Sequence, residues 1–169
     1  MKFRGLVTLM LGSVLSFTSN LFAEDGDGPG HKYVFAAPGK ITGESMATLH
    51  FGGGAQTPTY RGFGAAVELG YLAPMTYLAD GIGVLSANGL YLFGNSEKSN
   101  KAIPFATLGY SMGFRSGVVN GFNVGGGINY WFAKRMGVVM EFRDHAFDFS
   151  SRSTHFEHFY QFRFCWTFR

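Results

Sequence analysis

The chain has 169 residues, a length that suits one domain, and only 15% of them are charged. Lysine and arginine form no cluster, which excludes the basic footprint of a nucleic-acid-binding protein. Cys165 is the only cysteine, so an internal disulfide is excluded. Beyond the N-terminal stretch, no apolar run has the length of about 20 residues that a membrane-spanning helix needs.

The N-terminal stretch has the organisation of a secretory signal peptide. Lys2 and Arg4 form a charged start, residues 5–15 form an apolar run, and Leu21-Phe22-Ala23 supplies a cleavage zone. The alternative, an N-terminal anchor, would need a longer apolar run. Without Lys2 and Arg4, the 14 basic residues become 12, against 11 acidic ones. The predicted division of the chain is a signal peptide at 1–23, an acidic flexible leader at 24–31 and a folded domain at 32–169.

The chain as a whole combines 25 glycines with an aromatic content of 17%. Glycine weakens helices but suits strongly curved strands, so this composition favours an all-β closed structure. Evenly spaced clusters of turn-forming residues separate eight segments with strand character, as in an up-and-down barrel. The predicted strands are residues 32–37, 45–53, 62–72, 82–93, 102–114, 121–132, 136–144 and 156–168.

The last predicted strand is the most informative segment. Aromatic residues recur in it at every second position and alternate with mainly polar residues; they are Tyr160, Phe162, Phe164, Trp166 and Phe168. In a strand, this period places the rings on one face and the polar groups on the other. Because the polar face carries Arg163 in mid-strand, it does not suit a dry core, whereas aromatic-out and polar-in is the arrangement of a transmembrane barrel.

Four other segments repeat the alternation and place their charged residues opposite the apolar face. By parity, five charged side chains should point into the barrel: Glu68, Arg115, Glu141, Arg143 and Arg163. They could form a polar pore or a catalytic cluster, or a salt-bridge network that fills the lumen. We favour the network, because an eight-stranded barrel is just wide enough to hold side chains. The rival fold, a soluble lipocalin-like barrel, would need an apolar interior.

The strands must close on themselves, because an open edge in hydrocarbon leaves backbone groups unpaired. An even number of strands places both termini on one side, which we expect to be the periplasm. The connections expected outside are 38–44, 73–81, 115–120 and 145–155. Those expected in the periplasm are 54–61, 94–101 and 133–135.

These features together resemble the outer-membrane protein β-barrel domain family, with its opacity-type and small OmpA-like or OmpX-like members. The resemblance rests on the signal peptide, residues 121–132, residues 136–144 and the aromatic last strand. It implies a monomeric Gram-negative outer-membrane protein with a structural or surface-interaction role and no cofactor or metal. Its implied partners are membrane lipid, lipopolysaccharide, periplasmic chaperones and the barrel-assembly machinery, which recognises the last strand. A narrow passive pore is an alternative function.

A second alternative is a lipid-modifying enzyme similar to a lipid A deacylase. Such an enzyme could use a serine activated by a histidine, with an acidic residue that orients the histidine. The predicted last loop and its borders hold Asp144, His145, Ser150, Ser151, His155, Glu157 and His158. No fixed spacing among them matches a catalytic motif or a metal site, so solvated loop residues are the simpler interpretation. We therefore expect no enzyme activity.

Overall fold

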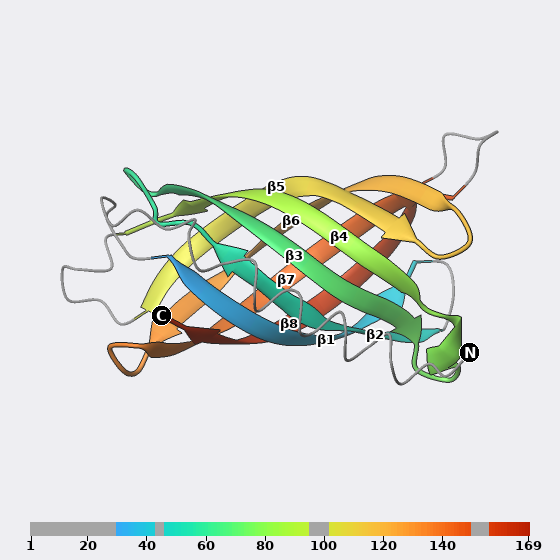
Figure 1. Cartoon of the computed structure of the whole chain (residues 1–169), viewed down its shortest axis with the longest axis horizontal. Coiled ribbons are helices and arrows are strands. Elements are labelled where there is room, and N and C mark those ends of the chain that lie inside the picture. The colour runs from blue at the N-terminus through green and yellow to red at the C-terminus, as the bar shows by residue number, and fades with distance from the viewer. Residues whose placement is uncertain (1–29, 43–45, 95–101, 150–155) are drawn as a thin grey trace.

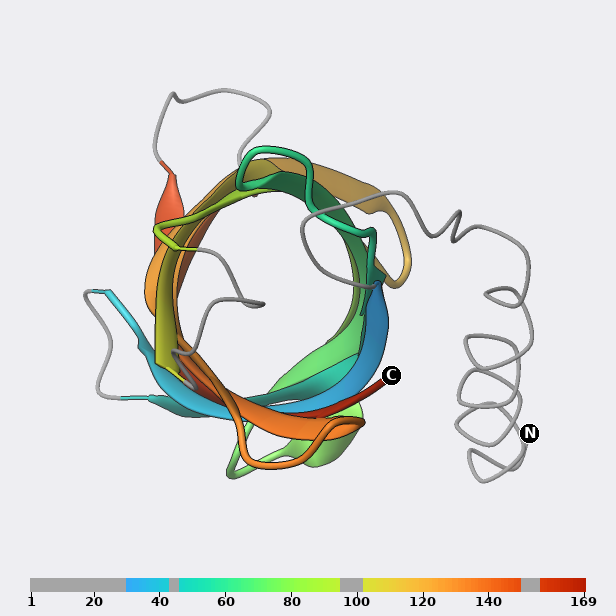
Figure 2. The same cartoon turned by 90° about the vertical axis from the view of Figure 1, so that its left-hand side faces the viewer.

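The chain forms a closed antiparallel β-barrel, seen from the side in Figure 1 and end-on in Figure 2. This computed structural model describes residues 30–42, 46–94, 102–149 and 156–169. Its strands are β1 (His31–Ile41), β2 (Ala47–Gln56), β3 (Phe63–Pro74), β4 (Ile82–Leu92), β5 (Ala102–Phe114), β6 (Val118–Trp131), β7 (Met136–Asp148) and β8 (Glu157–Phe168). Each strand pairs with the next, and β1 closes the barrel against β8. The predicted all-β fold with eight strands is confirmed.

Several strands extend beyond their predicted ends. β1 continues four residues past its predicted end at Ala37, to Ile41. β7 also continues four residues, past Asp144 to Asp148, and pairs with both β6 and β8 over this length. β1 begins at His31, one residue inside the predicted leader. The predicted signal peptide lies outside the described residues. In the part of the chain that is described, the one helix is the short 3-10 turn η1 (Leu78–Asp80), and no helix is long and apolar enough to cross a membrane.

The outer wall of the barrel is apolar and aromatic. Phe164 is 52% exposed, and the other members of the alternating aromatic series in β8 also point outward: Tyr160, Phe162, Trp166 and Phe168. Apolar residues on the outer faces of neighbouring strands continue this surface; among them are Val67, Leu108, Tyr110, Phe122, Ile128 and Phe142. The alternation predicted from the sequence therefore corresponds to two distinct faces of one closed sheet.

The inner face is filled from end to end. At the end of the barrel where β1 begins and β8 ends, the lumen holds two apolar clusters, represented by Phe35 with Val139 and by Leu90 with Ile103. At the opposite end, Phe147 and Phe159 pack with Leu72 and Val84. Polar and charged side chains occupy the space between these layers. The lumen is thus a packed core with a polar centre.

Candidate functional site

Four charged side chains meet at the centre of the lumen. Glu68 comes from β3, Glu141 and Arg143 from β7, and Arg163 from β8, and all four are buried. The structure therefore brings together four of the five charged residues assigned to the interior by parity. Their two negative and two positive charges balance, as charges in a low-dielectric interior require.

Each arginine contacts both carboxylates. Arg143 donates from Nη1 to Glu68 Oε2 at 2.5 Å and from Nε to Glu141 Oε1 at 2.7 Å. Arg163 donates from Nη2 to Glu68 Oε1 at 3.1 Å, and its Nη1 lies 3.2 Å from Glu141 Oε2. We call these four residues the central ion network. Because every charge has two opposite partners, the network crosslinks β3, β7 and β8 across the lumen.

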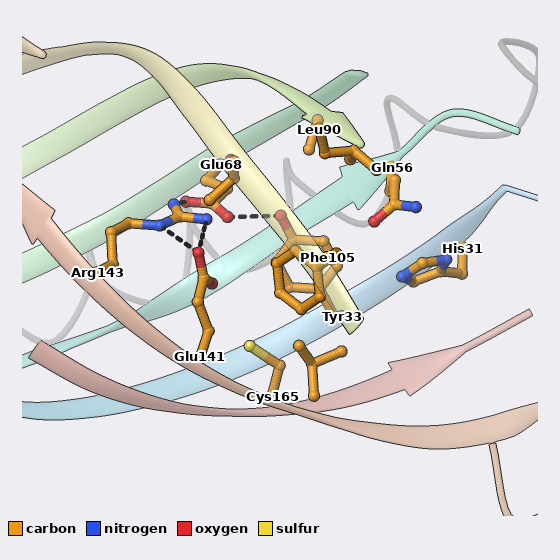
Figure 3. A pocket seen from close by; sticks show the side chains of 12 residues that line it. His31, Tyr33, Gln56, Glu68, Leu90, Phe105, Glu141, Arg143 and Cys165 are labelled. Atoms are coloured by element: carbon orange, nitrogen blue, oxygen red, sulfur yellow. Dashed lines mark hydrogen bonds and ion pairs between the residues drawn. The ribbon is translucent and has the colours of Figure 1, made fainter. Parts of the chain in front are cut away.

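Neutral side chains complete the network. Figure 3 shows the Tyr33 hydroxyl reaching Glu68, and this hydroxyl donates to Glu68 Oε1 at 2.7 Å. The Arg163 guanidinium lies 4.2 Å from the centre of the Phe35 ring, a cation–π contact. Gly125 leaves room for the carboxylate, because a Cβ added there would lie 2.7 Å from Glu141 Oε1. Sequence reasoning missed Tyr33, although its parity in β1 already placed it on the inner face.

A small cavity lies between the central ion network and the end of the barrel where β1 begins and β8 ends. Its volume is about 40 Å³, and its wall includes His31, Gln56, Phe105 and Cys165 (Figure 3). A cavity needs about 10–15 Å³ for each water molecule, so this one has room for a few waters. On the other side of the network, the buried cluster of Phe147, Phe159, Leu72 and Val84 fills the lumen.

A neutral polar layer separates the central ion network from this apolar cluster. His50 Nδ1 lies 3.0 Å from Gln161 Oε1, and His145 Nδ1 lies 3.0 Å from Ser111 Oγ. Asn123 donates from Nδ2 to Ser111 Oγ at 2.9 Å. The prediction that His145 is a solvated loop residue is wrong: it lies in β7, points inward and is fully buried. We therefore expect replacement of His145 by alanine to lower the stability of the folded barrel, whereas a solvated loop residue could be replaced without effect.

The assignment of Arg115 to the interior is also wrong. Arg115 follows the last residue of β5, so the alternation of the strand no longer applies to it. Its side chain is exposed at the end of the barrel, where Nη2 lies 3.0 Å from Asp80 Oδ1. Arg115 also donates from Nη1 to the Asp80 carbonyl oxygen at 3.0 Å. Its role is to hold the β5 end against the β3–β4 connection.

One further ion pair, between Asp144 and His158, lies on the outer face of the barrel wall. His158 Nδ1 is 2.7 Å from Asp144 Oδ2, and the two residues come from the paired strands β8 and β7. The His158 ring stacks on Tyr160, with ring centres 5.9 Å apart. A carboxylate that orients a histidine is one half of a hydrolytic site. Ser150, Ser151 and His155, the other residues of the lipid-enzyme hypothesis, lie outside the described residues.

The described residues contain no group of three or more histidine, cysteine, aspartate or glutamate side chains that could hold a metal ion. The buried His50 and His145 lie beside each other, with ring centres 5.5 Å apart in an edge-on arrangement. Their other neighbours in the polar layer are amides and hydroxyls.

Comparison with known proteins places the fold among small outer-membrane barrels. The N-terminal barrel domain of OprF from Pseudomonas aeruginosa is 13% identical with a TM-score of 0.57, and 82% of this chain covers 97% of it. Neisserial surface protein A is 10% identical with a TM-score of 0.61, and 82% of this chain covers 94% of it. The outer-membrane enzyme PagL is 16% identical with a TM-score of 0.53, and 81% of this chain covers 99% of it.

These TM-scores show a shared fold and, at such low sequence identity, nothing beyond the fold; the neighbours include an enzyme beside other barrels. No protein-family model matches the chain. No curated protein matches it in sequence either. The protein is thus an eight-stranded antiparallel barrel of the outer-membrane type, and paired charged side chains lie within its lumen.

Proposed function

We propose that this protein is an integral outer-membrane barrel of the opacity, OmpA-like and OmpX-like group, with a structural or surface-interaction role. The observation that carries the proposal is the reversed polarity of the barrel: exposed aromatic rings outside and paired charges inside. Exposing this wall to water would destabilise a soluble barrel by about 25 cal/mol for each Å² of apolar surface. In a bilayer, the same wall contacts hydrocarbon.

The filled lumen favours a scaffold over a passive pore. The central ion network uses both oxygens of Glu68 and of Glu141 for contacts with arginine. Beyond it, Phe147 and Phe159 pack with ring centres 5.8 Å apart and are almost fully buried. Passage of a solute would require breaking paired charges and displacing a packed apolar layer. In this proposal, the ends of the barrel contact partners, and the lumen supplies stability.

One observation supports a second candidate function, lipid hydrolysis. The Asp144–His158 pair lies on the outer wall, where a bilayer lipid would be within reach, and its geometry suits a general base. Within the described residues, no serine, threonine or cysteine hydroxyl or thiol is bonded to His158. This candidate therefore depends on a nucleophile from elsewhere, and we rank it below the scaffold.

Lipid analysis of cells separates the two functions. Mass spectrometry of lipid A and phospholipids should give the same acyl-chain profile in cells with the protein, without it, and with His158→Ala. The matched control is His50→Ala, a buried histidine that no lipid can reach. A missing acyl chain that depends on the protein and reappears in the His158→Ala cells would overturn the scaffold proposal and support the hydrolase.

A further inference from the structure

The connection between β3 and β4 turns apolar side chains toward its surroundings. It comprises residues 75–81 and includes the 3-10 turn η1. Tyr77 is 69% exposed, Met75 is 51% exposed and Leu78 is 50% exposed. We call these three residues the apolar tip. Surface connections are ordinarily polar, whereas apolar side chains gathered and exposed in one segment mark a contact with a membrane or with a partner.

Three successive carbonyl oxygens of this connection are bonded within the protein. The Tyr71 hydroxyl donates to the carbonyl oxygen of Leu78 at 2.8 Å. Arg115 donates from Nη1 to the carbonyl oxygen of Asp80 at 3.0 Å and from Nη2 to that of Ala79 at 3.4 Å. A segment surrounded by water does not need such partners, because water bonds its exposed carbonyls. Next to lipid, the protein itself must satisfy these backbone groups.

The connection lies over the outer wall of the barrel. Tyr71 points outward, because the next residue, Leu72, belongs to the apolar cluster in the lumen and successive side chains of a strand alternate. The centre of the Tyr71 ring lies 5.8 Å from that of Phe51 on β2. Gly81 passes directly beside the Tyr71 ring, since an added Cβ would lie 2.5 Å from Tyr71 Cζ, and the Gly81 nitrogen donates to the Tyr71 hydroxyl at 3.1 Å. In the end-on view of Figure 2, the green β3–β4 connection lies outside the ring of strands.

Tyr71 also indicates the depth of the connection in a bilayer. It lies near the end of β3, which ends at Pro74. Tyrosines near the ends of barrel strands lie at the level of the lipid headgroups, where the ring contacts apolar chains and the hydroxyl is hydrated. The segment bonded to this hydroxyl therefore lies at the membrane surface. The exposed ion pair between Arg115 and Asp80, with Nη2 and Oδ1 3.0 Å apart, suits the same hydrated layer.

We infer that the β3–β4 connection is an interfacial anchor, whose apolar tip inserts among the lipid headgroups and upper acyl chains at this end of the barrel. The inference rests on the proposed membrane location and adds a lipid contact beyond the barrel wall. The occupant is lipid, because the tip continues the outer surface of Phe51 and Tyr71, which the proposed function places against the bilayer. Burying the tip there removes its apolar surface from water and favours one depth of the barrel in the membrane.

Tryptophan quenching measures the position of the tip. The chain has two tryptophans, so Leu78→Trp combined with Trp131→Phe and Trp166→Phe gives a single reporter. The full chain is refolded into phosphatidylcholine vesicles with bromines on the upper part of the acyl chains, and iodide is the quencher in water. The matched control is Ser116→Trp in the same background, at an exposed position of the β5–β6 turn. We expect brominated lipid to quench Leu78→Trp several-fold more strongly than the control, and iodide to quench it several-fold less. Tyr77→Trp gives a second reading should Leu78→Trp fail to refold.

Three other outcomes are distinguishable. If iodide quenched Leu78→Trp and Tyr77→Trp as strongly as Ser116→Trp, and brominated lipid quenched neither, the tip would lie in water and the inference would be wrong. Protection from iodide without quenching by brominated lipid would assign the tip to a second copy of the chain or to another protein, which also overturns the inference. Failure of the proposed function would show in the wild-type chain: Trp166 lies on the outer wall, and brominated lipid would then not quench it.

Discussion

Replacing Arg163 by alanine should lower the free energy of unfolding by about 3–5 kcal/mol, the range for removing one member of a buried ion pair. Arg163 is fully buried and contacts both Glu68 and Glu141, so its loss leaves the lumen with one uncompensated negative charge. Arg143 alone cannot balance two carboxylates. The measurement is urea unfolding of the chain refolded in lipid vesicles, followed by tryptophan fluorescence.

Two further variants separate charge from side-chain volume. Arg115→Ala removes an exposed arginine that also has an acidic partner, and we expect a change within about 1 kcal/mol. Arg163→Met combined with Glu141→Gln restores neutrality while Arg143 keeps Glu68, so it should recover part of the lost stability. If Arg163→Ala were as stable as Arg115→Ala, the central ion network would not stabilise the barrel.

Replacing Phe164 by arginine should have the largest effect on the outer wall. Phe164 points outward near the middle of β8, opposite Ala36 of β1 and Met140 of β7. An arginine on the lipid face at the bilayer midplane lowers barrel stability by about 2–4 kcal/mol. The same unfolding measurement should therefore show a clear loss of stability in vesicles.

The matched control uses the same strand, face and substitution. Phe168 also points outward but ends β8, where the membrane interface is expected. Arginine near the interface lowers stability by only about 0–1 kcal/mol. If arginine had the same effect at Phe164 and at Phe168, the effect would not depend on depth in a bilayer. That result is expected for a barrel surrounded by water and would contradict the membrane location.

The sequence predicted the faces of the strands because side chains alternate with a fixed period of two. Glu68, Glu141, Arg143 and Arg163 could be assigned to the interior in this way. Their partners could not be predicted, because Glu68 and Arg143 come from β3 and β7, which are not neighbours in the sheet. Contacts across a lumen depend on the register of every strand between them.

The errors lie at or near the ends of strands. Parity was extended to Arg115, one residue beyond both the predicted strand and β5, which end at Phe114, so the alternation of the strand does not apply to it. The predicted strand ended at Asp144, within the charged run Arg143-Asp144-His145, whereas β7 continues to Asp148. In a barrel with a polar lumen, charged residues do not mark the end of a strand. The outward pairing of Asp144 with His158 followed from this longer strand and could not be seen without it.

The central claim is that the aromatic outer wall faces lipid while paired charges fill the lumen. The most direct test is the solubility and gel mobility of the folded chain with and without detergent. We expect the chain to stay folded only in detergent or lipid vesicles, and to migrate differently before and after boiling. A chain that remains folded and monodisperse in aqueous buffer without detergent would contradict the account.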